Sequence, residues 1–239
     1  MSVLCSWSVA ETPSAADSDA PSVPPAAKTY RGREIAQTMH YLGAPWLIRE
    51  SREREEQCAT LLTALDIKAG DTVCDLGCGN GFYTLKLASL VGDLGTVLAV
   101  DIQQQMLGLL RARAESAEIL NIHPILSTVD DPNLPTQQVD LLLLVDVYHE
   151  FSHPAAMLQA IHRSLRPNGR VALVEFRQED PQVPIKRLHK MSIAQILNEF
   201  PPAGFKLVGQ FERLPWQHVM FFARGDSPLA EIQATPWQE

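Results

Sequence analysis

The sequence predicts an α/β protein with a doubly wound, mostly parallel sheet. Short segments rich in Val and Leu alternate with segments whose apolar residues recur at helical spacing. A glycine-rich turn at residues 77–81 stands where one predicted strand gives way to the next predicted helix. Strands that alternate with helices of about 10 to 15 residues form parallel units and place helices on both faces of the sheet.

Residues 29–66, which precede the alternation, predict an N-terminal helical cap. The chain has helical character from about Tyr30 to Leu65, with a break near Gly43-Ala44-Pro45. Residues 49–57, RESREREEQ, mix both signs of charge at spacings of three and four residues. Such a run predicts a solvated helix face.

The alternation itself covers residues 71–176. It predicts strands at residues 71–77, 96–101, 123–128, 139–147 and 170–176, and helices at residues 81–91, 103–117 and 154–165. The strand VDLLLLVDV is a continuous apolar run, which is typical of a strand buried on both faces. A helix at residues 191–200 and two strands at 205–212 and 217–224 follow, and these two strands are expected to pair antiparallel.

The composition fits a single domain with appendages and argues against a nucleic-acid partner. The 239-residue chain carries a formal charge of −8, and no run of lysines or arginines offers a phosphate-binding surface. Its cysteines form no C-x-x-C pair, which favours free thiols in a reducing compartment. No apolar stretch approaches the roughly 20 residues that span a membrane. We therefore expect a cytoplasmic protein without a membrane span.

The two ends of the chain are predicted to lie outside the folded domain. Residues 1–28 are rich in Pro, Ala, Ser and Asp, which predicts a disordered leader. The small residues Ser8-Val9-Ala10 leave open a remnant export signal, and in that case the protein would be exported. Residues 225–239 are predicted to be a flexible tail.

Residues 149–153, HEFSH, match the H-E-x-x-H signature of zinc proteases. That signature binds zinc because two histidines four residues apart share one face of a helix. Here the segment follows an apolar strand, and Pro154 marks the first turn of a new helix. His149 and His153 are therefore not expected to share a face, and no metal site is predicted. His149 and Glu150 nevertheless stand at the carboxyl end of a strand, where ligands of such sheets bind.

The stretch VCDLGCGNGFYTLKLA, residues 73–88, carries the cofactor prediction. Gly77, Gly79 and Gly81 fall at the strand-to-helix turn, where glycine tolerates positive φ and lets a ligand approach the backbone. Asp101 ends the next strand, where a carboxylate can accept both hydroxyls of a ribose. These residues predict a site for an adenosine-containing cofactor.

Two features favour S-adenosylmethionine over a dinucleotide. The dinucleotide fingerprint is G-x-G-x-x-G, whereas this turn reads G-x-G-x-G and has Phe82 at the place of the third glycine. Asp75, two residues before the first glycine, would repel a pyrophosphate and suits the ammonium of an amino-acid tail. A nicotinamide-dependent oxidoreductase remains a disfavoured alternative.

With these motifs, the chain resembles the class I S-adenosylmethionine-dependent methyltransferases over about residues 58–223. DLGCGNG and VLAVDI are similar to the first two motifs of that family, DDPNLPTQQVDLLLLVDVYHEF to the third and fourth, and LRPNGRVALVEF to the strand after its Pro-Gly turn. The resemblance implies a seven-stranded Rossmann-like sheet of order 3-2-1-4-5-7-6 with an antiparallel last strand. It also implies a methyltransferase domain at residues 67–224.

The resemblance further implies the residues that bind the cofactor. Asp75 and the glycine turn would surround the methionine part, and Asp101 would hold the ribose. Asp130 would approach the adenine amine, and Asp146 would face the methionine end. The full set is Asp75, Gly77, Cys78, Gly79, Asn80, Gly81, Asp101, Ile102, Val129, Asp130 and Asp146.

The acceptor is implied by the loop VDVYHEF, which resembles that of small-molecule methyltransferases, including quinone- and sterol-type carbon methylators. His149 and Glu150 are then possible general bases, and Tyr148 would line the pocket. The alternative is a purely structural role, in which His149 caps the helix that begins at Pro154. No [DN]-P-P-Y motif of the kind found in DNA-adenine methyltransferases follows the strand, which lowers nucleic acid as a substrate.

Two other segments are predicted to contact the ligands. Arg177, His189 and Lys190 could hold an anionic acceptor, and Met39, Tyr41 and Trp46 could cover the cofactor; solvated loops and simple packing are the alternatives. A non-catalytic module that binds S-adenosylmethionine also stays open. The identity of the acceptor and the oligomeric state do not follow from the sequence.

We expect the protein to bind S-adenosylmethionine and its demethylated product, and not to bind NAD, because the turn has G-x-G-x-G spacing and Asp75 would repel a pyrophosphate. Isothermal titration calorimetry with the three compounds tests this. Tight binding of NAD without binding of S-adenosylmethionine would contradict it.

Overall fold

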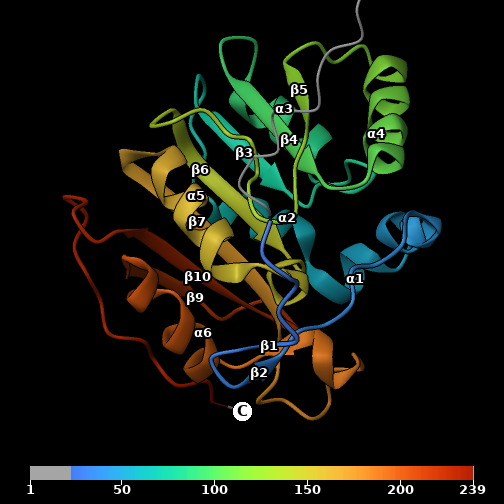
Figure 1. The fold of residues 1–239 in the computed structure, drawn as a ribbon. Coiled ribbons are helices and arrows are strands. Elements are labelled where there is room, and N and C mark those ends of the chain that lie inside the picture. Colours follow the sequence, from blue (N-terminus) through green and yellow to red (C-terminus); the bar gives the residue numbers. More distant parts are fainter. Residues whose placement is uncertain (1–22, 239) are drawn as a thin grey trace, which may run out of the picture.

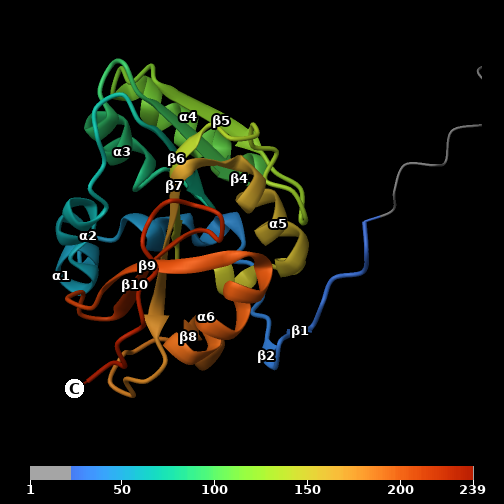
Figure 2. The same ribbon diagram turned by 90° about the vertical axis from the view of Figure 1, so that its left-hand side faces the viewer.

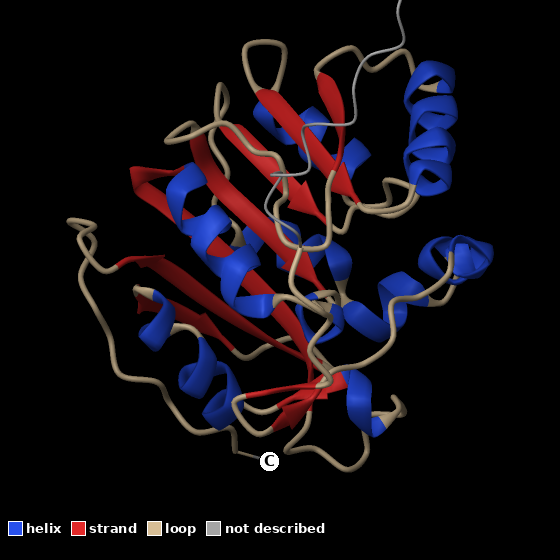
Figure 3. Ribbon diagram, viewed as in Figure 1, coloured by secondary structure: helices blue, strands red, loops and turns tan. Residues whose placement is uncertain are grey.

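The central sheet of the computed structural model, which describes residues 23–238, has the predicted strand order (Figures 1 and 3). From edge to edge it runs β5 (Ile122–Leu126), β4 (Thr96–Asp101), β3 (Thr72–Leu76), β6 (Val139–Val145), β7 (Leu165–Arg177), β10 (Gln217–Arg224) and β9 (Phe205–Phe211). The first five strands pair in parallel, and β10 is antiparallel to both β7 and β9. This is the order 3-2-1-4-5-7-6, so the fold prediction is confirmed. A two-residue strand, β8 (Lys190–Met191), adds to β7.

Helices cover both faces of the sheet (Figure 2). One face packs against α2 (Cys58–Ala64), α3 (Thr84–Val91) and α4 (Gln104–Ser116), and the other against α5 (Pro154–Ser164) and α6 (Ile193–Glu199). Strand β6 shows why its sequence is apolar throughout. Leu141 and Leu143 join the cluster of α2 and α3, whereas Leu142 and Leu144 join the cluster of α5 and α6. A strand with helices on both sides has no solvent face to carry polar residues.

The connection from α5 to β7 differs slightly from the prediction. The strand begins at Leu165 rather than at residue 170, and its pairing with β6 shifts from Val139↔Leu165 to Leu141↔Arg170. The intervening Pro-Asn-Gly segment therefore forms an irregularity inside the strand, which accommodates residues without a partner on β6.

The predicted helical cap is wrong for residues 29–40. The chain first forms a hairpin of β1 (Thr29–Tyr30) and β2 (Arg33–Glu34), whose turn places Arg31 and Gly32 at positive φ. A 3₁₀ helix, η1 (Tyr41–Ile48), then runs through the Gly-Ala-Pro segment that was expected to be a break. The interruption lies instead at Gln57, whose φ of 49° separates α1 (Arg52–Glu56) from α2.

The charged run at residues 49–57 is not a fully solvated helix face. Arg52 and Glu56 are buried, and the Nε of Arg52 lies 2.8 Å from a carboxylate oxygen of Glu56. The other oxygen of Glu56 accepts a hydrogen bond from Arg49. Burying a paired charge costs less free energy than burying a single one. The pairing therefore allows this short helix to direct charged side chains inward.

The ends of the chain are only partly described. Of the predicted leader, residues 1–22 lie outside the described residues, and residues 23–28 have no regular secondary structure. The described part of the predicted tail also lacks helices and strands, but it is anchored: the backbone N–H of Ile232 donates to Leu207 of β9, and Trp237 packs on the core. Among the described residues, no helix has the length and apolar character that a membrane crossing requires.

The N-terminal hairpin is fixed to the domain by a buried carboxylate. Glu199, at the end of α6, is fully buried and accepts two hydrogen bonds from the guanidinium of Arg33, at 2.8 and 3.0 Å. The hydroxyl of Tyr148 donates to the same carboxylate at 2.7 Å. The hairpin thus supplies the counter-charge that this acid needs inside the protein.

We expect Arg33→Ala to lower the free energy of unfolding by about 3–5 kcal/mol, because it leaves Glu199 charged and buried without its partner. Arg31→Ala, in the same hairpin but at an exposed position, should change it by less than about 0.5 kcal/mol. Urea denaturation of the two variants measures the difference, and equal stability would refute the anchoring role of Arg33.

Candidate active site

A cavity of about 590 Å³ lies beyond the carboxyl ends of β3, β4, β6 and β7. Ligands of open α/β sheets bind at this edge. One part of its wall comes from the glycine turn and the end of β4, with Gly77, Gly79 and Asp101. Another part comes from the segments after β6 and β7, with His149 and His189. The cavity is therefore large enough, and varied enough, for a cofactor beside a second ligand.

Each of the three glycines in the turn has a separate reason to be glycine. All three have positive φ. A Cβ at Gly77 would lie 2.4 Å from Val147, and one at Gly79 would lie 2.6 Å from Leu47, so side chains there would collide with the cavity wall. A Cβ at Gly81 would lie 2.2 Å from Leu110, which shows that this glycine lets α4 pack closely rather than lining the cavity.

The other two residues of the turn do not line the cavity. Cys78 is buried in the cluster beneath α4. Asn80 is also buried, and its side-chain N–H donates to the carbonyl of Ala44 in η1 at 3.0 Å. Asn80 therefore attaches the N-terminal segment to the glycine turn, which is a supporting role and not the direct contact that was predicted.

Asp101 occupies the place expected of a ribose-binding acid. Its carboxylate lines the cavity and accepts hydrogen bonds from the backbone N–H groups of Gly79 and Gln103, at 2.9 and 2.8 Å. Burial raises the pKa of this acid, and the backbone donors oppose that shift. Each carboxylate oxygen keeps a further lone pair for a ligand hydroxyl. Ile102, exposed beside it, forms part of the same wall.

Two predicted cofactor acids do not reach the cavity. Asp75 is buried beneath the turn and accepts a hydrogen bond from Thr84 at 2.5 Å, and burial raises its pKa to about 6. Asp130 turns back to accept a hydrogen bond from Thr128 at 2.7 Å, while its neighbour Val129 lines the cavity as predicted. In both cases a nearby threonine hydroxyl competes with the ligand for the carboxylate. A sequence motif does not include such local donors.

Asp146, at the end of β6, lines the cavity in a strained backbone conformation. Its φ is 52°, which is uncommon for a residue other than glycine. One carboxylate oxygen accepts a hydrogen bond from Gln217 at 2.7 Å, and the other has no partner among the described residues. Burial raises the pKa of Asp146 well above its ordinary value. An ammonium placed here would supply the missing partner, so the predicted position near a methionine end is chemically reasonable.

His149 is held by a carboxylate that the sequence did not reveal as functional. Its Nδ1 lies 2.6 Å from Glu175, a fully buried residue of β7, and its backbone N–H donates to the same carboxylate at 3.2 Å. Burial would lower the pKa of His149, but the charge and hydrogen bond of Glu175 outweigh it and raise the pKa. The signal for Glu175 was a lone acid inside an apolar strand, RVALVEF.

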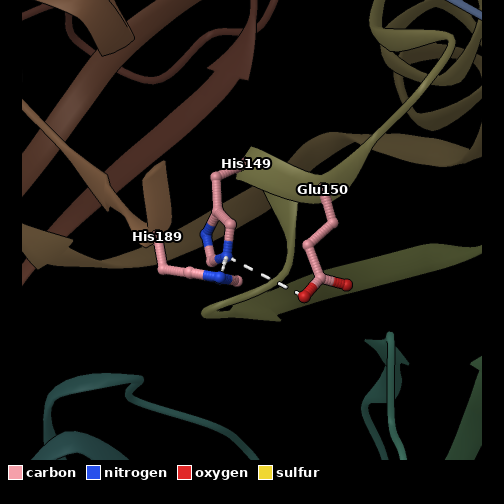
Figure 4. A group of neighbouring side chains, drawn as sticks. All are labelled: His149, Glu150 and His189. Carbon is pink, nitrogen blue, oxygen red and sulfur yellow. Dashed lines mark hydrogen bonds and ion pairs between the residues drawn. The ribbon is translucent and has the colours of Figure 1, made fainter. Parts of the chain in front are cut away.

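The opposite ring nitrogen of His149 faces two other side chains (Figure 4). Nε2 lies 3.0 Å from Nδ1 of His189 and 4.0 Å from a carboxylate oxygen of Glu150. All three residues line the cavity. His149 stands in the 3₁₀ helix η2 (Tyr148–Glu150) and His189 in η3 (Arg187–His189), so neighbouring strands deliver both to one point.

Two expectations for the loop after β6 are decided by these contacts. The idea that His149 caps the next helix is wrong, because α5 begins at Pro154 with His153 at its cap position. His153 turns away, with its ring nitrogens near Ser152 and the carbonyl of Pro24. The two histidines of the H-E-x-x-H match therefore do not face one another, as predicted.

Tyr148 does not line the pocket, contrary to prediction. It is fully buried in the core beneath α6, and its hydroxyl binds Glu199. An aromatic ring directly after a strand packs inward when the 3₁₀ turn directs the next two residues toward the cavity. Tyr148 is therefore a packing residue in this fold.

The N-terminal segment covers part of the cavity, as Met39 and Trp46 were expected to do. Both line it, whereas Tyr41 does not. Glu150 accepts from the backbone N–H of Met39 at 3.3 Å, and burial raises the pKa of Glu150 to about 7. Gln103, which the sequence did not single out, binds the backbone of Met39 and Tyr41 at 2.9 and 2.8 Å.

Of the residues expected to hold an anionic acceptor, only His189 reaches the cavity. Arg177 is buried and donates to the carbonyls of Leu214, Pro215 and Gln217, and Lys190 donates to the carbonyl of Asp180. Lys186 lines the cavity in their place. The long segment after β7 thus contributes Lys186 and His189 to the site, and not Arg177 or Lys190.

A family model described as a methyltransferase domain matches residues 67–211. The chain belongs to this methyltransferase domain family. Among curated relatives, this chain is 33% identical over 116 residues to a 2-phytyl-1,4-naphtoquinone methyltransferase from Nostoc sp., a match that covers 48% of this chain and 51% of that protein. It is 26% identical over 153 residues to a demethylmenaquinone methyltransferase from Shouchella clausii, covering 64% and 63%.

The chain also shares its fold with solved structures. A SAM-dependent methyltransferase from Aquifex aeolicus superposes with a TM-score of 0.73 at 23% identity, over 77% of this chain and 98% of that one. The predicted family, the class I S-adenosylmethionine-dependent methyltransferases, is confirmed. The two curated relatives are each matched over less than two thirds of their own length.

We expect Asp101→Ala to weaken S-adenosylmethionine binding by about 1.5–3 kcal/mol, because charged hydrogen bonds to the ribose are lost. Asp130→Ala is the matched control: its carboxylate contacts Thr128 rather than the cavity, so its affinity should stay close to that of the parent. Calorimetric titration of both variants with the cofactor tests the assignment. An unchanged dissociation constant in a folded Asp101→Ala variant would show that another residue holds the ribose.

Proposed function

We propose that the protein transfers the methyl group of S-adenosylmethionine to a small-molecule acceptor of the quinone type in its reduced, quinol form, a cyclic compound with an ionisable oxygen. The observation that carries this proposal is one cavity in which Asp101 and Asp146 line one part and His149, Glu150 and His189 line another. The names of the curated relatives, which are quinone methyltransferases, support the acceptor class.

The walls around the histidines suit a flat, largely apolar acceptor. Phe151, Phe176 and Ile185 line this part of the cavity, and aromatic and aliphatic side chains favour the burial of a ring. Lys186 and His189 add polar groups at one side. A ring with an oxygen substituent could place its apolar face on these walls and its oxygen toward the histidines.

Methyl transfer itself is a displacement at carbon. The bond from the sulfonium to the methyl group breaks as the bond to the acceptor forms, and the cofactor leaves as a neutral sulfide. The protein contributes chiefly alignment. The acceptor must also lose a proton, and His149 and Glu150 are the residues we propose to promote that loss, because both face the cavity and have raised pKa values.

His149→Ala should lower turnover by about 100-fold or more, the usual contribution of a group that assists proton loss. The affinity for S-adenosylmethionine should be nearly unchanged, because the ring acts on the acceptor and not on the cofactor. Methyl transfer is measured with radiolabelled cofactor and short-chain naphthoquinol acceptors. His153→Ala is the control, since this ring points away from the cavity.

The experiment also tests the alternative of a non-catalytic binding module. Cofactor binding without methyl transfer to any acceptor of a metabolite extract would favour that alternative. Equal turnover of His149→Ala and the parent chain would remove His149 from the mechanism.

A further inference from the structure

His149, Glu150 and His189 present three potential metal ligands to one point of the cavity. One atom from each residue, two imidazole nitrogens and a carboxylate oxygen, lies within 4.8 Å of the other two. Ligand atoms about 2.1 Å from one ion are at most about 4.2 Å apart. The separations of 3.0 Å and 4.0 Å from Nε2 of His149 already meet this limit. The third pair, His189 and Glu150, lies within 4.8 Å, so at most a small rotation of either side chain brings it within the limit.

Glu175 prepares His149 for such a role. The carboxylate of Glu175 accepts a hydrogen bond from Nδ1 of His149. The ring proton is therefore on Nδ1, and the lone pair of Nε2 is directed at the cavity. A carboxylate behind a metal-binding histidine is the usual outer-shell partner, because it fixes the tautomer and makes the ring a better ligand. The side chain of Glu175 is fully buried, so it has no exposed surface to interact with solvent.

Glu150, the carboxylate of the cluster, has no lysine or arginine beside it among the described residues. In that part of the chain, its only neighbour within ion-pair distance is His149. Two imidazole nitrogens 3.0 Å apart must share either a proton or a metal ion, because two lone pairs facing one another at this distance would repel. A divalent cation would serve both imidazoles and Glu150 at once.

We propose that His149 Nε2, His189 Nδ1 and the carboxylate of Glu150 form a binding site for a divalent transition metal such as Zn²⁺, with open positions toward the acceptor. Two histidines and one carboxylate on one side of an ion match known catalytic zinc and non-haem iron sites. This inference rests on the proposed function and deepens it: His149 and Glu150 promote proton loss as ligands of the ion. The ion would lower the pKa of the acceptor hydroxyl, whose proton passes to solvent water, and would stabilise the oxyanion that remains.

This site differs from the zinc motif that the sequence contains. The H-E-x-x-H match would use His149 and His153, but His153 lies against Pro24 and Ser152. The third ligand comes instead from His189, 40 residues after His149. The expectation of no metal site, based on the failure of the helical motif, did not consider a ligand delivered by the neighbouring strand.

The test is calorimetric titration of Zn²⁺ into the tag-free full-length chain after removal of metal with a chelator. The parent chain and His153→Ala should each bind one equivalent. His189→Ala, at a half-buried position that the fold should tolerate, should lose this binding, and Glu175→Gln should weaken it by about 10- to 100-fold. Melting temperatures establish that each variant is folded, and Co²⁺ absorption spectra report the nitrogen and oxygen ligands independently.

Equal Zn²⁺ affinity in the parent chain and His189→Ala, or no binding by the parent chain, would overturn the inference. The proposed function is separable from it. If metal-free enzyme methylates its acceptor at the full rate and His149→Ala does not, the metal inference fails and the methyltransferase proposal stands. If Zn²⁺ binds at the three residues but S-adenosylmethionine does not bind, the metal site stands and the methyltransferase proposal fails.

Discussion

The contact between Glu175 and His149 is the constraint on which the acceptor side of the site depends. Glu175 lies near the end of β7 and His149 follows β6, so one carboxylate joins two neighbouring strands where the cavity opens. It binds both the ring and the backbone N–H of His149, and therefore fixes the path of the η2 turn. Glu150 faces the cavity and Tyr148 the core as a consequence of that path.

A second set of contacts determines how the N-terminal segment closes over the sheet. Arg33 neutralises Glu199, whereas Gln103 and Glu150 bind the backbone near Met39. Gln103 lies on the cofactor side of the cavity, next to Asp101, and Glu150 lies on the acceptor side, next to His149. The covering segment is therefore held by the same elements that would contact the two ligands, so its position depends on both parts of the cavity.

The fold was predictable because it follows from patterns with strong periodicity. The apolar run of β6 and the glycine turn before α3 fixed the sheet and its switch point. Asp101 was predictable because strand and loop geometry place it at the site. Asp75 and Asp130 were not, because Thr84 and Thr128 offer closer donors that a motif does not include. Glu175 was not predicted, and His189 was predicted only as a residue that holds the acceptor and not as a neighbour of His149. Both lie far from His149 in sequence, and only the pairing of β6 with β7 and the loop that follows bring them together.

The segment over the cavity is held largely through its main chain. Gln103 binds the carbonyl of Met39 and the N–H of Tyr41, Glu150 binds the N–H of Met39, and Asn80 binds the carbonyl of Ala44. These contacts do not depend on which side chains the segment carries. Substitutions at Met39 or Trp46 can therefore reshape the ceiling of the cavity while the course of the chain is retained. In evolutionary terms, this arrangement separates the choice of substrate from the stability of the cover, so related enzymes can diverge in acceptor without rebuilding the fold.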